Sequence, residues 1–163
     1  KKTLNVNPYF LTTEENNSLE SLEVQIKCDS EMDEFWSYVG KKSNQRWTWY
    51  AIDRKSGCIL AWHNGKRKDE DFLVLWKLLE AFKIHKFHTD NWGSYSKYIP
   101  ADQHRIGKDN TWKIERKNLN FRTHIKRLNR KTKKKTKSET IHDNVIGMYI
   151  EAFYYKTGIY GNN

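Results

Sequence analysis

The chain has 163 residues, which is long enough for one domain with a core. Of these residues, 37% are hydrophobic and 14% aromatic, and the aromatic content is higher than disordered chains usually have. No run of 18 apolar residues is present and the N-terminal KKTLNVNPYF lacks a signal-peptide core, so we expect no membrane insertion. Cys28 and Cys58 have no CxxC partner, which argues against a zinc module and favours a reduced, cytoplasmic setting.

The net charge of +10 is concentrated in one part of the chain. Residues 105–137 contain 14 Lys and Arg against two acids, whereas the rest of the chain has a net charge of −2. A basic segment of this kind is typical of proteins that bind polyanions. The alternative is a solvated basic tail, especially for KKKTK at 133–137. The adjacent amphipathic helix favours nucleic acid as the partner. The sequence contains no lipidation motif, which argues against binding to a membrane.

Composition divides the chain into three parts. Residues 1–29 are predicted to be an N-terminal extension or linker, since they contain Pro8 and the polar run TTEENNSLES. Residues 30–156 are predicted to form the globular domain, and residues 157–163 a tail.

The globular part opens with three β-like runs, at 31–39, 45–53 and 58–64. They are joined by short turns that contain Gly40 and Gly57, which favours an antiparallel meander. The middle run is apolar on both faces, so we expect it inside the sheet.

Helices and single strands alternate after the meander. The apolar spacing predicts a helix over 69–82, a strand at 86–90 and a further strand at 104–108. Two helices follow, one basic over 111–130 and one amphipathic from about Ser138, a plausible N-cap, through Tyr155.

The basic helix is the most informative segment. Its apolar residues recur at helical spacing and predict a buried stripe of Ile114, Phe121, Ile125 and Leu128. Glu115 is its one acid, and Asn118 and Arg122 follow on a neighbouring polar stripe. A lone carboxylate on a cationic helix is suited to hold a metal ion against phosphate. The alternative is an exposed helix whose Glu pairs with basic neighbours.

This order of elements predicts an α/β fold with a ribonuclease H-like mixed sheet of five strands, three antiparallel and then parallel ones, flanked by helices. If the fourth strand lies beside the first, Asp33 and Asp90 stand on adjacent strands about 5 Å apart. The basic helix would bring Glu115 to the same place. Asp33 lies among apolar residues, where an unpaired carboxylate is costly unless it has a function, whereas its neighbour Glu34 should face the other way. Asp90 could equally be a turn-forming residue.

Three such carboxylates are hard oxygen ligands that suit Mg²⁺, with Mn²⁺ as a substitute. Two ions of this kind would clamp the attacking and leaving oxygens of a phosphoryl displacement.

Four motifs, EMDEFWSYVG, TDNWGSY, IERKNLNFR and RLNRKTKKKTKSETIHDNVIGMY, resemble those of the transposases of the InsAB-type short bacterial insertion sequences. The likeness extends from about Cys28 to Tyr155. In that family the Asp of MDE, the Asp of TDxW and the Glu of IERxN form a DDE triad with 24 residues between the last two acids. Here 24 residues separate Asp90 from Glu115. The resemblance therefore implies that Asp33, Asp90 and Glu115 are the catalytic, metal-binding residues.

The resemblance also implies partners and a mechanism. A metal-activated water cuts a transposon end, and the freed 3′-hydroxyl then attacks target DNA. Trp92 and Tyr95 would stack on an unpaired base, or else pack beneath a loop. Backbone phosphates would be held by Lys108, Arg116, Lys117, Asn118, Arg122, Lys126, Arg127, Arg130 and Lys131.

Two other functions stay open at this stage: a ribonuclease H-like or junction nuclease that only hydrolyses, and an inactive DNA-binding module. Full-length members of the family have an N-terminal zinc finger and helix-turn-helix, which are not visible in this sequence, so we expect the catalytic half. A bacterial cytoplasmic protein associated with the nucleoid is implied, and assembly of several copies on DNA is left open.

Overall fold

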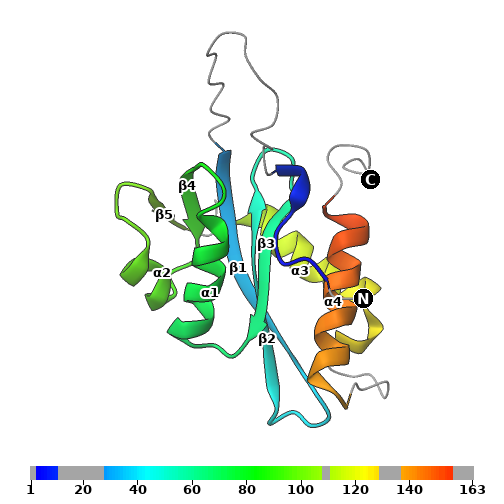
Figure 1. Ribbon diagram of the computed structural model, residues 1–163. Helices are drawn as coiled ribbons and strands as arrows, with labels where there is room; N and C mark the ends of the chain where they lie inside the picture. Colours follow the sequence, from blue (N-terminus) through cyan, green and yellow to red (C-terminus); the bar gives the residue numbers. More distant parts are fainter. Residues whose placement is uncertain (1–2, 11–27, 108–110, 129–136, 156–163) are drawn as a thin grey trace.

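The structure is a computed structural model that describes residues 3–10, 28–107, 111–128 and 137–155. Within these residues, five strands form one sheet in the order β3-β2-β1-β4-β5 (Figure 1). The strands are β1 (Cys28–Tyr38), β2 (Gln45–Asp53), β3 (Ile59–Gly65), β4 (Ile84–Thr89) and β5 (His104–Ile106). The first three are antiparallel neighbours, whereas β4 runs parallel to β1 and β5 parallel to β4. The predicted ribonuclease H-like mixed sheet is confirmed.

Helices cover both faces of this sheet. The helices are α1 (Asp69–Leu79), α2 (Gly93–Tyr98), α3 (Trp112–His124) and α4 (Glu139–Phe153). In the part of the chain that the structure describes, none of them is long and apolar enough to cross a membrane.

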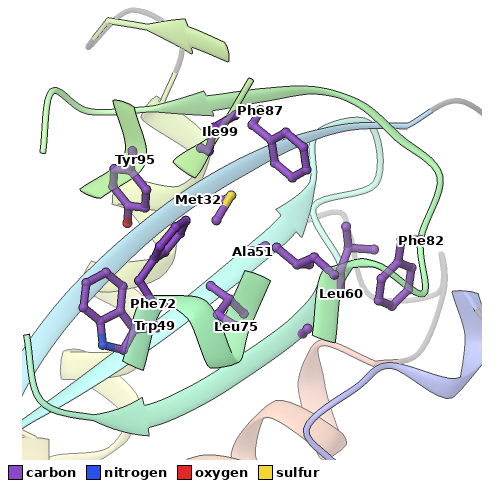
Figure 2. Packing of buried hydrophobic residues seen from close by; sticks show 12 residues of the cluster. Met32, Trp49, Ala51, Leu60, Phe72, Leu75, Phe82, Phe87, Tyr95 and Ile99 are labelled. Carbon is purple, nitrogen blue, oxygen red and sulfur yellow. The ribbon is translucent and has the colours of Figure 1, made fainter. Parts of the chain in front are cut away.

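One core lies between the sheet and the pair α1 and α2. It contains Met32 of β1 and Trp49 of β2, with Phe72 of α1 and Tyr95 of α2 packed against them (Figure 2). The helix α1 ends at Leu79 rather than at residue 82 as its apolar pattern predicts, but Phe82 is still buried in this core.

A second core lies on the opposite face, under α3 and α4. The predicted apolar stripe of α3 is confirmed, since Ile114, Phe121, Ile125 and Leu128 are all buried there. The helix is shorter than predicted, however, because Ile125 leaves the helical conformation with φ −92° and ψ 88°. A 3₁₀ turn, Lys126–Leu128, follows. The residues after it, up to 136, lie outside the described ones.

The predicted position of β2 inside the sheet is also confirmed. Trp49 and Ala51 face the first core, whereas Tyr50 and Ile52 face the second. A strand buried on both faces has to be apolar on both, which explains its near-continuous apolar sequence.

The described part of the predicted N-terminal extension, residues 3–10, packs against the domain. Val6 bridges Ala61 of β3, and the backbone N–H of Asn7 donates to the carbonyl of Leu60 at 2.7 Å. These contacts cover the edge of β3, which would otherwise expose unpaired backbone groups. Strand β1 also begins at Cys28, inside the range predicted for the linker. Residues 11–27 and the predicted tail at 157–163 lie outside the described ones.

The helix α4 begins as predicted, at the N-cap Ser138, whose hydroxyl accepts from the backbone N–H of Ile141 at 3.4 Å. Gly147 in this helix gives room to the N-terminal segment, because a Cβ there would lie 2.5 Å from Oγ1 of Thr3. The segment is therefore held between β3 and α4.

Candidate active site

Two polar contacts join α3 to the central strand β1. The buried carboxylate of Glu31 accepts the backbone N–H of Ile114 at 3.0 Å, and the amide Nδ2 of Asn118 donates to Oδ2 of Asp33 at 2.6 Å. The N-cap residue Thr111 makes no side-chain cap hydrogen bond. A strand carboxylate therefore satisfies a first-turn donor of α3, where the helix dipole favours negative charge.

Asp33 lies partly buried in the middle of β1, on the face that α3 covers. Its Oδ1 accepts the backbone N–H of Glu34 at 2.8 Å. Burial is the main reason that the pKa of Asp33 is raised to about 7, and the charges of Glu34 and Asp90 raise it further. The hydrogen bonds from the Glu34 backbone and the Asn118 side chain lower the pKa of Asp33, but they do not compensate for burial. Asp33 is thus a carboxylate whose charged form the fold disfavours.

Asp90 follows β4 and lies next to Asp33. The parallel ladder pairs Glu31 with His88, and Asp33 and Asp90 each stand two residues beyond that pair. The effect of Asp90 on the pKa of Asp33 agrees with this proximity. Oδ1 of Asp90 also accepts the backbone N–H of Trp92 at 3.0 Å, so the turn-forming role is present as well.

Glu115 is exposed in the first turn of α3. It precedes Asn118 by three residues, a spacing that places two Cβ atoms about 5–6 Å apart on one helix face. Among the described residues, no three His, Cys, Asp or Glu side chains gather closely enough to hold a metal ion. The structure therefore brings Asp33 and Asp90 together, while a shared site with Glu115 stays a prediction.

Glu34 points to the opposite face, as the alternation of the strand predicts. Its Oε1 accepts from Nη2 of Arg67 at 2.7 Å and its Oε2 from the hydroxyl of Tyr95 at 2.7 Å. Burial raises the pKa of Glu34, and the contacts with Tyr95 and Arg67 offset part of that effect. Glu34 is accordingly a paired core carboxylate.

The prediction that Trp92 and Tyr95 stack on a base needs a correction. Tyr95 has no exposed surface, packs against Phe72 and donates to Glu34, so it is a core residue and cannot stack on a base in this conformation. Trp92 is half-buried, with its ring centroid 4.9 Å from that of Trp49 and with the guanidinium of Arg67 5.3 Å away. Of the two, Trp92 alone keeps surface near Asp90.

The residues predicted to bind phosphate fall into three groups. Lys108, Arg130 and Lys131 lie outside the described residues. The cations that are exposed on α3 and the turn after it are Arg116, Lys126 and Arg127.

The remaining three residues of that set are half-buried. The ammonium of Lys117 lies 4.1 Å from the ring centroid of Tyr154, and burial lowers its pKa to about 8. Both ends of the Asn118 amide are hydrogen-bonded within the protein. The prediction that Lys117 and Asn118 bind phosphate therefore does not fit this geometry. Arg122 has a buried Nε with no hydrogen-bond partner among the described residues.

Sequence reasoning missed two residues of this region, Glu31 and Tyr50. Tyr50 is the cross-strand partner of Asp33, and its hydroxyl lies 2.7 Å from Oδ1 of Asn118. Glu31 is two residues before Asp33 and so shares its face, which is the signal that could have identified it. No comparable signal exists for Tyr50, because its contact depends on both the strand register and the docking of α3.

A comparison with protein families shows the family of this chain. The family model described as IS1 transposase matches residues 25–156. The chain belongs to the IS1 transposase family. The matched range contains β1, β4 and α3, together with Asp33, Asp90 and Glu115.

Individual members of the IS1 family are similar over most of this chain. The insertion element iso-IS1n protein InsB of Shigella dysenteriae is 49% identical over 121 residues, which cover 74% of this chain and 92% of that protein. The IS1 protein InsB of Shigella flexneri is 43% identical over 131 residues, 80% of this chain and 99% of that protein. The IS1 4 protein InsB of Escherichia coli K12 is 42% identical over 131 residues, 80% of this chain and 78% of that protein.

Proposed function

We propose that this transposase family member performs the chemical steps of transposition: it cuts a phosphodiester at the end of an insertion element and joins the freed 3′-hydroxyl to target DNA. The observation that supports this most strongly is Asp33, a partly buried carboxylate next to Asp90, on the face where α3 docks. A carboxylate in this position costs folding free energy. Its presence in the fold is understandable if the reaction requires it.

Divalent metal ions fit the donor set. Two adjacent carboxylates, one with a raised pKa, favour a cation because it offsets both burial and mutual repulsion. We propose that Asp33 and Asp90 hold Mg²⁺, or Mn²⁺ in its place, and that the exposed Glu115 completes the ligand set. When bound, two such ions supply an activated nucleophile and stabilise the charge of an in-line phosphoryl displacement.

The protein side chains would bind and orient the DNA. The exposed cations Arg116, Lys126 and Arg127 are available to backbone phosphates, and contacts of this kind set position rather than sequence preference. Arg122 can add a bidentate phosphate contact, for which its guanidinium is better suited than an ammonium. Base stacking remains part of the proposal for Trp92 alone.

A strand-joining assay tests the proposal. The full chain is incubated with Mn²⁺, a duplex that ends in the 3′-hydroxyl of the element and a target plasmid. We expect joined products, and a loss of at least about 100-fold in Asp33→Asn, Asp90→Asn and Glu115→Gln. Matched controls are Asp102→Asn and Glu70→Gln, which change exposed acids elsewhere and should keep the native rate.

The alternatives give different products in the same assay. A ribonuclease H-like or junction nuclease would cut DNA and never join it. An inactive binding module would shift DNA in a gel and produce neither product. Either result, obtained with the native chain, would contradict the proposal.

A further inference from the structure

Asn118 connects two residues of the sheet that are not adjacent in sequence. Asp33 of β1 and Tyr50 of β2 are directly opposite each other in the antiparallel ladder. The side chain of Asn118 in α3 contacts both, with Nδ2 2.6 Å from Oδ2 of Asp33 and Oδ1 2.7 Å from the hydroxyl of Tyr50. The amide therefore lies across the two strands at the position of the proposed catalytic carboxylate.

Tyr50 is a rigid anchor for this amide. It has no exposed surface, and its ring packs edge-on against Phe35 and Phe121. Its hydroxyl lies 2.7 Å from Oδ1 of Asn118 and 3.0 Å from the carbonyl oxygen of Ile114, and burial keeps it protonated by raising its pKa well above the usual range. A hydroxyl that donates to Oδ1 leaves the NH₂ of Asn118 directed at Asp33.

Asp33 is consequently held by one donor on each oxygen. The backbone N–H of Glu34 donates to Oδ1 and the amide of Asn118 donates to Oδ2. A carboxylate has about four lone-pair positions, so each oxygen keeps one for a further partner. This arrangement fixes the orientation of the carboxylate without using up its capacity to bind.

We propose that Asn118, held by Tyr50, is a positioning residue that sets the orientation of the Asp33 carboxylate for the reaction, and that it does not contact DNA phosphate. This inference rests on the proposed function, since it assigns a role within the same site. It also differs from the sequence-based prediction, which grouped Asn118 with the phosphate-binding residues.

Two measurements on the full chain separate positioning from phosphate binding. Residues that orient a metal ligand typically affect metal affinity or activity by about 10–100-fold when changed. We therefore expect Asn118→Ala to weaken Mn²⁺ binding and slow joining within that range, while DNA affinity and its salt dependence stay native. A lost phosphate contact would instead lower the slope of log affinity against log salt by about 0.9 and leave Mn²⁺ binding unchanged, which would overturn the inference.

A double-mutant cycle tests whether Tyr50 acts through Asn118. Tyr50→Phe should give a smaller loss than Asn118→Ala, and the double variant should lose no more than Asn118→Ala alone. Losses that multiply would show independent roles and contradict the anchor. Melting temperatures of all variants verify folding.

Matched controls exist elsewhere in the molecule. Asn64→Ala removes an amide that donates to the carboxylate of Asp143 at 3.0 Å, and Tyr155→Phe removes a hydroxyl that donates to the carbonyl of Leu4 at 2.6 Å. Both should keep native Mn²⁺ affinity. Equal effects in controls and site variants would reduce the role of Asn118 to stability and overturn the inference. A native chain that neither binds Mn²⁺ nor joins DNA would overturn the proposed function and the inference together, whereas an active native chain with a fully active Asn118→Ala variant would overturn the inference alone.

Discussion

Replacing Asp33 by Asn should stabilise the metal-free fold at neutral and basic pH. The pKa of Asp33 is about 7 in the fold and 3.8 for an ordinary Asp, mainly because of burial. The folded state therefore holds its proton more tightly than the unfolded state, so stability falls as pH rises from about 4 to 7. Asn avoids this loss because it has no charge.

The size of the effect follows from the same shift. Each pKa unit corresponds to about 1.36 kcal/mol, so the upper limit is about 4 kcal/mol. Asp33 is only partly buried and keeps some hydration, so we expect a gain of about 2 kcal/mol at pH 8 and almost none at pH 4. The Asn side chain fits, because the amide of Asn118 can flip, accept from Asn at position 33 and donate to Tyr50, whose hydroxyl then donates to Ile114.

Urea unfolding in EDTA at pH 4, 6 and 8 measures this difference, with Asp102→Asn as the control for loss of an exposed charge. The gain should grow with pH in Asp33→Asn and be absent in the control. Added Mn²⁺ should stabilise the native chain, so that it becomes more stable than Asp33→Asn. A variant that is less stable than the native chain at pH 8 would refute the view that the Asp33 carboxylate is costly to the fold.

Three further predictions concern the docking of α3, the N-terminal segment and DNA binding. Glu31→Ala should destabilise the fold by about 2–3 kcal/mol in urea unfolding, because it leaves the N–H of Ile114 without its partner; a loss under about 0.5 kcal/mol would show that water replaces the cap. Gly147→Ala should lower the melting temperature by displacing Thr3, and Thr3→Gly should restore it; no rescue would place the strain elsewhere. Finally, we change three exposed cations to Ala together, Arg116, Lys126 and Arg127. The slope of log DNA affinity against log salt should then fall by up to about 2.7. An unchanged slope would mean that DNA binds elsewhere.

The arrangement of the elements was predictable because it depends on local patterns. The β-like runs, the turns at Gly40 and Gly57 and the apolar stripe of α3 each indicate a local feature, and the order of the elements restricts the topology. The adjacency of Asp33 and Asp90 follows directly from that topology.

Other features depend on contacts that local patterns do not encode. The segment around Val6 has no strand periodicity and is ordered by the free edge of β3. The end of α3 depends on how Ile125 and Leu128 reach the core. The sequence does not distinguish Tyr95 from Trp92, because both are aromatic residues shortly after Asp90. Only the packing of α2 buries Tyr95 completely.

The most direct test of the account is the anomalous scattering of manganese in crystals of the full chain soaked in Mn²⁺. We predict manganese bound between the carboxylates of Asp33 and Asp90, with Glu115 turned toward it and Asn118 still bonded to Asp33. Manganese bound at other acids, with Asp33 and Asp90 free of metal, would contradict the proposed catalytic site.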